Sequence, residues 1–286
     1  MNIIQVYKKF PTHKDCIQHL EEVKWKWEPT CPYCKSKKSS KMWKRHHCNN
    51  CNTSYSVTVG TIFHRTRLDL QKRFLAITLV LNAKKGISAR QIARDLEVNK
   101  DTAWRMIMQI RKAMVQDNNL FEWIVEVDET YVGGKEKNKH WSKRTKWTQG
   151  RSTKTKTPVF GVANRDTGKV KANVVKDVQR KTLHNEMRSK IKEWSQVMSD
   201  EWLWYNGTNK KFKHMVVKHN QGQYVDWDAH TNTIEWFWSL FKRWIVGQYH
   251  HISKTYMDRY VDEFCYRYNN RDTENLFEMF IMASVA

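Results

Sequence analysis

Three acidic side chains stand where an apolar stretch ends or a helix begins, positions that suit a catalytic site. Asp128 closes the apolar run WIVEVDE and Asp200 closes WSQVMSDE, so each is expected at the end of a buried strand. Glu235 lies near the start of a helix expected over residues 230–249. Carboxylates from two strands and a helix can converge to hold divalent metal ions. The three residues therefore predict an enzyme.

The helix expected over residues 230–249 must position the third acid. Its apolar residues recur every three or four positions, which predicts a buried stripe: Ile234, Phe237, Trp238, Phe241 and Ile245. Thr231 or Asn232 can cap its start, and Asn232, Glu235 and Lys242 fall near one edge of the stripe. If the helix is considered alone, the plainer interpretation is an amphipathic helix whose Glu and Lys side chains are solvated. The two earlier aspartates favour the catalytic interpretation.

Four of the six cysteines form two CxxC pairs, Cys31 with Cys34 and Cys48 with Cys51. Thiolates two residues apart can both reach one Zn²⁺ at about 2.3 Å, and two such pairs complete a tetrahedral site. Four protein ligands leave no open position, so the predicted zinc is structural. His46 and His47 are expected at the surface. A redox CxxC or four unrelated buried cysteines are the alternatives, and the paired spacing disfavours both.

The charge balance indicates a polyanionic partner. The 286 residues include 51 Lys and Arg against 29 Asp and Glu, a net charge of +22. Such an excess repels itself unless a polyanion binds, and nucleic acid is the usual one. The sequence contains no run of 18 apolar residues, so no membrane span is expected. Its first residues do not resemble a signal peptide. A cytoplasmic, nucleoid-associated location is expected, or a nuclear one in a eukaryotic host.

Residues 88–114 predict two helices joined by a tight turn, a helix-turn-helix. The shared core is expected to contain Ile92, Leu96, Val98, Trp104 and Ile107. The exposed side chains of the second helix are candidate DNA contacts: Lys100, Thr102, Arg105, Gln109 and Arg111. Many helical hairpins bind nothing, but this composition favours DNA contact, with some of the side chains touching only phosphate.

Residues 135–156 are rich in Lys and Arg and have no hydrophobic period, which predicts a flexible basic loop. Lys143, Arg144 and Lys146 are candidate DNA contacts in this loop. The loop is expected to become ordered on a phosphate backbone, whereas a solvated loop without DNA is the plainer alternative.

The order of the remaining elements predicts a mixed sheet flanked by helices, an α/β fold. In this sheet the first and fourth strands would bring Asp128 and Asp200 side by side. Three domains are expected: residues 1–66 as an N-terminal helix and zinc ribbon, 67–117 as an all-α helix-turn-helix region, and 118–286 as the catalytic domain.

Several motifs together carry a resemblance to a known family: CPYC and CNNC, SVTVGTIF, KKGISARQIARDL, TAWRM, VEVDETYVGGKEKNKH, VMSDEW, HTNTIEWFWSLFKR and YVDEFCYRYNNR. From about residue 10 to 280 the chain resembles the DDE transposases of bacterial insertion sequences. More narrowly, it is similar to the zinc-ribbon group related to the eukaryotic Merlin elements.

This resemblance implies an RNase H-like catalytic domain with Asp128, Asp200 and Glu235 as ligands of Mg²⁺ or Mn²⁺. It implies cleavage of DNA strands at the element's terminal inverted repeats and transfer of the 3′-hydroxyls to target DNA. Lys242 could hold a phosphate near the site. Double-stranded DNA is the expected partner, bound by a homodimer or higher oligomer in a synaptic complex.

Two alternatives stay open at this point. Asn232 lies one turn before Glu235 and could be the third ligand, although a carboxylate binds hard cations better than an amide. Glu126, on the same strand face as Asp128, is a weaker ligand candidate, and Glu129 and Glu201 are expected to point away. The second alternative is a catalytically silent DNA-binding protein or repressor derived from a transposase, which the intact set of acids disfavours.

Overall fold

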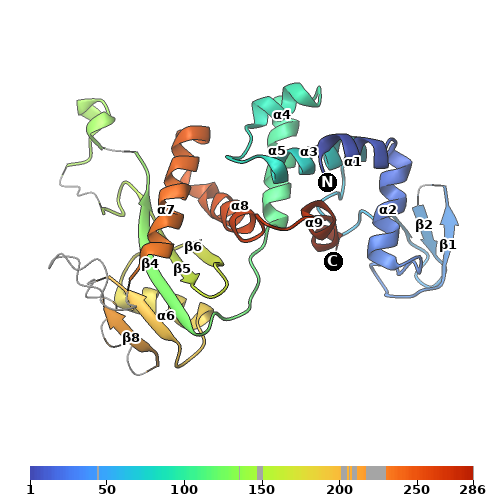
Figure 1. Ribbon diagram of the computed structural model, residues 1–286. Helices are drawn as coiled ribbons and strands as arrows, with labels where there is room; N and C mark the ends of the chain where they lie inside the picture. Colours follow the sequence, from blue (N-terminus) through green and yellow to red (C-terminus); the bar gives the residue numbers. More distant parts are fainter. Residues whose placement is uncertain are drawn as a thin grey trace. The chain divides into compact units, whose positions relative to one another are not determined.

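The computed structural model describes residues 1–43, 45–134, 136–146, 151–200, 205, 207, 211–216 and 230–285. The chain divides into two compact units, one formed by Met1–Met114 with Asp272–Ala286 and the other by Val115–Arg271 (Figure 1). In the part of the chain that is described, no helix is both long enough and apolar enough to cross a membrane.

The first unit is mainly helical. Its helices are α1 (Ile3–Lys9), α2 (His13–Trp25), α3 (Leu70–Asn82), α4 (Ala89–Asp95), α5 (Lys100–Ala113) and α9 (Leu276–Val285). Short polar residues cap two of them: Ser88 accepts a hydrogen bond from the Gln91 amide, and Asn99 accepts one from the Asp101 amide. These caps fix the starts of α4 and α5, the two helices expected from residues 88–114.

A small three-stranded antiparallel sheet carries the cysteine pairs. Its strands are β1 (Ser39–Met42), β2 (Arg45–Cys48) and β3 (Ser54–Tyr55), in the order β1-β2-β3. Strands β1 and β2 form a hairpin in which Met42 pairs with Arg45 and Ser39 with Cys48. The hairpin thereby ends beside the second cysteine pair.

Helix α9 corrects the expected domain boundaries. Residues 118–286 were predicted to form one domain, but α9 packs in the first unit. Phe277 lies 5.7 Å from Phe74 of α3, ring centre to ring centre, and Glu278 lies 2.6 Å from Lys9 Nζ. The buried face of α9 therefore completes the core of the N-terminal helices, a contact between the two ends of the chain that local patterns cannot reveal.

The second unit is built on a five-stranded mixed sheet in the order β6-β5-β4-β7-β8. Its strands are β4 (Ile124–Val132), β5 (Thr157–Asn164), β6 (Val170–Val174), β7 (Gln196–Ser199) and β8 (Lys213–Val216). Strands β6, β5 and β4 are antiparallel, whereas β4, β7 and β8 are parallel. The predicted mixed α/β fold is confirmed, and β5 and β6 form a hairpin around residues 165–168.

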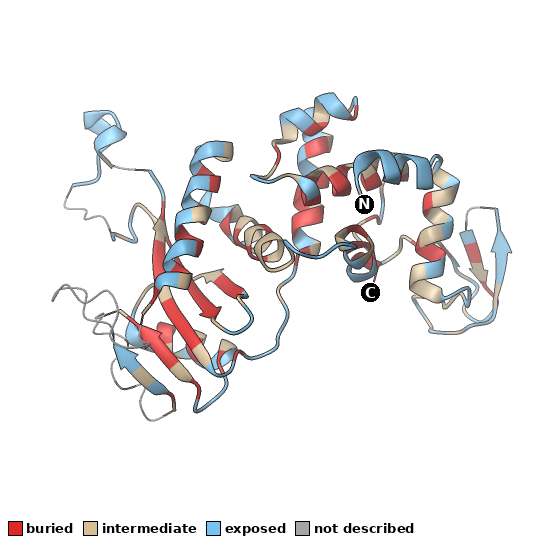
Figure 2. Cartoon of the chain, in the orientation of Figure 1, coloured by how far each residue is buried: buried red, intermediate tan, exposed pale blue. Residues whose placement is uncertain are grey.

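Helices cover both faces of this sheet, and its strands are largely buried (Figure 2). Helix α6 (Arg180–Lys190) packs on one face through Leu183 and Met187. Helices α7 (Asn232–Trp244) and α8 (Met257–Asn269) pack on the other face, and α7 continues as a π-helical turn, Ile245–Tyr249. The buried residues of α7 are Ile234, Phe237, Trp238, Phe241 and Trp244, and Ile245 in the following turn is buried too. The predicted stripe is therefore confirmed at all five positions, with Trp244 added to it.

Candidate active site

The two aspartates lie on neighbouring strands, although Asp128 is the fifth of the nine residues of β4 and not at a strand end as the sequence predicted. In the parallel β4–β7 pair, Val125 stands opposite Val197 and Glu126 opposite Met198. Continuing this register by two residues sets Asp128 beside Asp200, which directly follows β7. Adjacent strands lie about 4.8 Å apart, so this register brings Asp128 and Asp200 close together. The sequence predicted this juxtaposition from the order of the strands.

The surroundings of Asp128 strongly shift its pKa. Burial raises the pKa of Asp128 well above its usual value of 3.8, and the charges of Glu129 and Asp200 raise it further. The Glu129 amide donates to Asp128 Oδ1 at 2.8 Å, which opposes this rise in pKa, and the Glu235 carboxylate adds a smaller increase. A clustered set of carboxylates of this kind is the environment that a bound cation would relieve.

Glu235 is presented by the first turn of α7. Its side chain is exposed, and Thr231 Oγ1 donates a hydrogen bond to Glu235 Oε1 at 2.7 Å. Thr231 is the N-cap residue, but its side chain makes no capping bond to the helix amides. Thr231 therefore occupies the expected N-cap position, but its hydroxyl binds the Glu235 carboxylate instead of a backbone amide.

The other two predicted residues of α7 are exposed on the same helix. Asn232 is its first residue, and its amide donates to His230 Nδ1 at 3.4 Å, a contact at the helix entry. Lys242 follows Glu235 by seven residues, close to two full turns, so both side chains leave the same face of α7.

Gly161 determines how closely α7 approaches the sheet. It stands opposite Asp128 in the β4–β5 pair. A methyl group at Gly161 would lie 2.8 Å from Cη2 of the Trp238 ring and 3.1 Å from Ile234 Cδ1. The missing side chain lets the buried stripe of α7 rest directly against the strand next to Asp128.

Glu126, the weaker ligand candidate, lies in a buried network of hydrogen bonds. Its side chain is fully buried, and Arg165 Nε donates to its Oε1 at 2.6 Å. It also accepts hydrogen bonds from the first turn of α7. The sequence pattern placed Glu126 on the same strand face as Asp128 but did not reveal these partners.

Glu129 faces away from Asp128, as predicted, but it still affects the site. It is buried on the α6 side of the sheet, where Tyr205 Oη donates to its Oε2 at 2.8 Å. Burial raises the pKa of Glu129, and the Asp200 charge adds to that rise. Glu201 lies outside the described residues.

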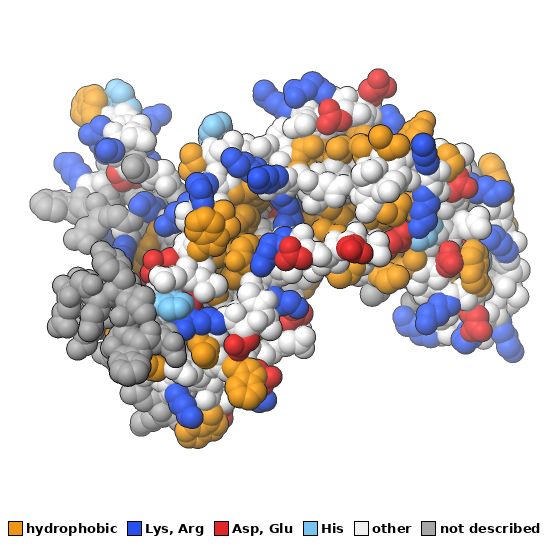
Figure 3. All heavy atoms as spheres, in the orientation of Figure 1, with side chains coloured by type: hydrophobic (Ala, Val, Ile, Leu, Met, Phe, Trp, Pro, Cys, Tyr) orange, Lys and Arg blue, Asp and Glu red, His pale blue; other side chains and the backbone are white. Residues whose placement is uncertain are grey.

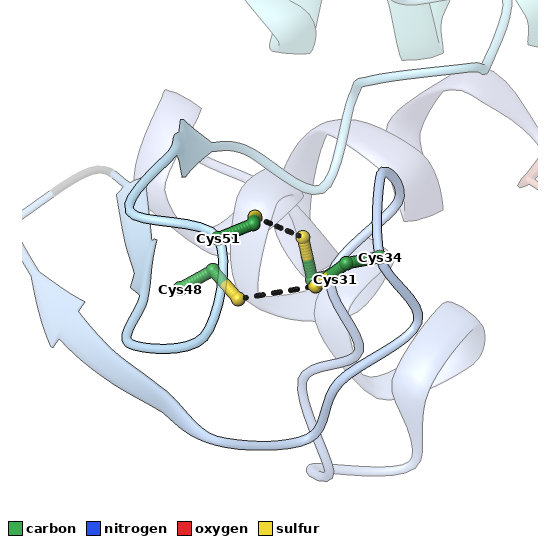
Figure 4. A group of neighbouring side chains, drawn as sticks. All are labelled: Cys31, Cys34, Cys48 and Cys51. Atoms are coloured by element: carbon green, nitrogen blue, oxygen red, sulfur yellow. Dashed lines mark hydrogen bonds between the residues drawn. The ribbon is translucent and has the colours of Figure 1, made fainter.

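The four paired cysteines converge on one point (Figure 4). Their sulfur atoms all lie within 4.8 Å of one another, with Cys31 Sγ 3.6 Å from Cys51 Sγ and Cys34 Sγ 3.5 Å from Cys48 Sγ. Four sulfurs at about 2.3 Å from a zinc ion are about 3.8 Å apart, whereas a disulfide would require about 2.05 Å. This group could hold zinc.

Both cysteine turns have the same backbone design. The residue after each pair, Lys35 and Asn52, has a positive φ of 60° and 54°. The backbone amide of Ser36 is the main cause of a Cys34 pKa lowered to about 6, which favours the thiolate that a metal binds. The two turns therefore hold the sulfurs inward.

His46 corrects one expectation for this region. It was expected at the surface, but only 3% of it is exposed, and its Nε2 lies 3.0 Å from Glu21 Oε1 of α2. Its ring packs against Trp25 and Tyr55. Strand β2 has its inward face at this position, so the histidine joins the ribbon to α2 and lies outside the sulfur group.

Helix α5 exposes some of its predicted DNA contacts and buries another. Lys100 and Arg105 are exposed, and Thr102 is half-buried. Arg111 is only 3% exposed, so the expectation that it faces solvent is wrong. It falls on the same stripe as Ile107 and Ile110, and its guanidinium contacts Met108 Sδ.

Two further residues of α5 differ from expectation. Trp104 was placed in the shared core, but 38% of it is exposed because the stripe runs through Ala103, Met106 and Ile107. Gln109 is half-buried and accepts a hydrogen bond from Arg73 of α3. Figure 3 shows Lys and Arg side chains over α4, beside the exposed part of α5.

The described part of the basic loop contains two short 3-10 turns, Glu136–Asn138 and Trp141–Lys143. Lys143 and Lys146 are exposed. Arg144 is also exposed, but it donates to the carbonyl oxygens of Lys137 and Lys139 at 2.8 and 3.0 Å, so it shapes the loop.

Comparison with known proteins identifies the class of protein to which the second unit belongs. A family model described as an ISXO2-like transposase domain matches residues 120–269, more than half of the chain. The chain therefore belongs to the ISXO2-like transposase family. The matched residues include β4, β7 and α7, the elements that carry the three carboxylates.

A particular relative extends the similarity beyond that unit. A protein of Halobacterium salinarum, described as an uncharacterized protein in transposable element ISH50, is 27% identical over 270 residues. The match covers 90% of this chain and 91% of the relative. Among solved structures, a chain of a pre-cleavage Mos1 transpososome is similar over 73% of this chain and 78% of its own length. It has 12% identity and a TM-score of 0.21, which is too low to carry an argument.

Proposed function

We propose that this chain is a metal-dependent DNA transposase that cleaves strands at the ends of its element and joins the 3′-hydroxyls to target DNA. The observation that supports this most strongly is the β4–β7 register, which sets Asp128 beside Asp200, with Glu235 close enough to raise the pKa of Asp128. Membership of a transposase family supports the same activity.

The donor set suits hard divalent cations. Asp128, Asp200 and Glu235 offer carboxylate oxygens, the ligands that Mg²⁺ and Mn²⁺ prefer, and their mutual repulsion favours a cation among them. Asn232 remains the alternative third ligand. When bound, a pair of such ions would activate the attacking oxygen and stabilise the leaving oxygen.

The proposed reaction consists of two displacements at phosphorus. Water attacks a phosphodiester bond at the element end, and the broken bond leaves a 3′-hydroxyl. This hydroxyl then attacks a phosphodiester of the target, so one P–O bond forms for each that breaks. Lys242, on the same face of α7 as Glu235, would hold a phosphate near the site.

We further propose a division of labour between the two units, in which the first binds element ends and the second performs the chemistry. Exposed Lys100 and Arg105 on α5, with Thr102 beside them, would contact the terminal inverted repeat, and Lys143 and Lys146 would add affinity for any duplex. Joining two ends to one target would require a dimer or higher oligomer.

DNA binding is tested by measuring affinity for terminal-repeat and random duplexes at several salt concentrations. Arg105→Ala is expected to cost about 1–3 kcal/mol on the terminal repeat and to reduce discrimination, whereas Lys143→Ala should weaken both duplexes equally and lower the salt slope by about 1. Unchanged discrimination in Arg105→Ala would remove this residue from base readout.

The catalytic proposal is tested by incubating the purified protein with a terminal-repeat duplex in Mg²⁺, in Mn²⁺ and in EDTA. We expect strand cleavage with either ion and none with EDTA. Tight, repeat-specific binding without cleavage in any condition would instead identify a catalytically silent DNA-binding protein.

A further inference from the structure

Glu126 makes a dense set of contacts for a fully buried carboxylate. Its Oε1 accepts from Arg165 Nε at 2.6 Å and from Thr233 Oγ1 at 3.0 Å, and its Oε2 accepts from the Ile234 amide at 2.9 Å. His230 Nδ1 lies 3.3 Å from Oε1. A buried carboxylate is costly unless it is paired and hydrogen-bonded, and both conditions are met here.

These contacts replace the cap that α7 lacks. The first amides of a helix have no partner within the helix, and Thr231 does not supply one from its side chain. Glu126 accepts the Ile234 amide from the neighbouring strand β4. Arg165, in the turn between β5 and β6, also donates to the carbonyl oxygen of His230. One ion pair therefore fastens the start of α7 to two strands.

The same fastening point determines where Glu235 lies. Glu235 follows Ile234 directly, and its carboxylate is held by the buried Thr231 hydroxyl at 2.7 Å. Glu126 stands two residues before Asp128 on the same face of β4. A path of hydrogen bonds thus joins the strand that carries Asp128 to the helix turn that carries Glu235.

We propose that Glu126, Arg165 and Thr231 are positioning residues that fix Glu235 relative to Asp128. This inference rests on the proposed metal-dependent function and assigns Glu126 a role outside the ligand set. The Glu126–Arg165 pair holds the backbone of the first turn of α7, and Thr231 holds the carboxylate itself.

The test uses four variants. Glu126→Gln keeps the size of the side chain but removes the charge that pairs with Arg165. Thr231→Val removes the hydroxyl, and Thr231→Ser restores it. Glu263→Gln is the matched control, because Glu263 is an equally buried carboxylate of the same unit that contacts Arg267 on α8.

Two measurements on the DNA-free protein separate positioning from general stability. Hydrogen exchange of the peptide containing residues 232–236 should increase about tenfold in Glu126→Gln, a loss of about 1.4 kcal/mol of local protection, and stay unchanged in Glu263→Gln. The Mn²⁺ affinity, followed by electron paramagnetic resonance, should fall 10–100-fold in Glu126→Gln and Thr231→Val. Thr231→Ser should recover it.

Two results would overturn the inference. In the first, Glu126→Gln resembles Glu263→Gln in both measurements, so the ion pair contributes only to stability. In the second, exchange increases but the Mn²⁺ affinity does not change, so the first turn of α7 does not position a ligand. Failure of the proposed function is recognised separately: the wild-type protein would then show no Mn²⁺ binding that Asp128→Ala removes, and the positioning role would be overturned with it.

Discussion

The cysteine group of the first unit and the carboxylate group of the second unit are assembled in different ways. The cysteines come from two tight turns close in sequence, and their sulfur atoms all lie within 4.8 Å of one another. The carboxylates come from β4, the end of β7 and α7, elements that are far apart in sequence.

This difference follows from charge and from the source of the geometry. Local backbone turns hold the four sulfurs, and a protonated thiol carries no charge that would separate them. The carboxylates repel one another, and elements far apart in sequence hold them in place through contacts such as those of Glu126. Because zinc binding supplies folding free energy in a small zinc site, removing zinc should damage the fold of the first site. The second site is held by the packed sheet and α7, so removing metal should leave its fold intact.

The largest expected effect is on the cysteine site. Cys34→Ser should reduce the bound metal from one zinc per chain to well below one and unfold the ribbon, since zinc binding supplies about 10–16 kcal/mol of folding free energy in small zinc domains. Metal analysis and protease sensitivity of residues 28–60 provide the readout. Cys16→Ser, a buried cysteine outside the group, is the control and should keep its zinc. Zinc-free wild-type protein with an intact ribbon would contradict this side of the comparison.

A smaller effect is expected where α7 rests on the sheet. Gly161→Ala should destabilise the second unit by about 1–3 kcal/mol, because the added methyl meets the Trp238 ring and Ile234 in a packed core. Thermal unfolding should show a decrease in Tm of several degrees. Gly134→Ala is the control, because nothing lies within 4 Å of its added methyl. Equal Tm values for the two variants would mean that α7 can shift outward without cost.

The smallest expected effect has the opposite sign. Asp128→Asn should stabilise the metal-free protein at neutral pH, on the order of 1 kcal/mol, because the ionised carboxylate is penalised in the fold. A group whose folded pKa is raised favours the fold below its ordinary pKa of 3.8, and this advantage is lost as pH rises toward the folded pKa. The stability gained by Asp128→Asn over the wild-type protein should therefore be absent near pH 3 and should grow with pH.

Chemical denaturation in EDTA at several pH values measures that gain. A destabilised Asp128→Asn protein at neutral pH would mean that the aspartate is held by favourable contacts, and the contrast with the cysteine site would fail.

Local patterns in the sequence predicted the parts of the molecule that local forces determine. The spacing of Cys31, Cys34, Cys48 and Cys51 predicted their convergence, because short turns leave few alternatives. The order of the elements predicted the mixed sheet and placed β4 next to β7.

The features that the sequence did not reveal depend on contacts distant in the chain. Arg111 and His46 are buried because a helix stripe and a strand face point inward there, although their side-chain types suggested the surface. The role of Glu126 could not be predicted, because its partners Arg165 and Ile234 come from two other segments. Helix α9 joins the first unit for the same reason.

The central claim, that Asp128, Asp200 and Glu235 form the catalytic metal site, is tested most directly by cleavage of a pre-bound terminal-repeat duplex in Mg²⁺ and Mn²⁺. Replacing any of these three residues by Ala should abolish cleavage and strand transfer while DNA binding stays nearly unchanged. Asn232→Ala should only slow the reaction. If Glu235→Ala still cleaves and Asn232→Ala is inactive, the third ligand is Asn232 and the claim is wrong at that position.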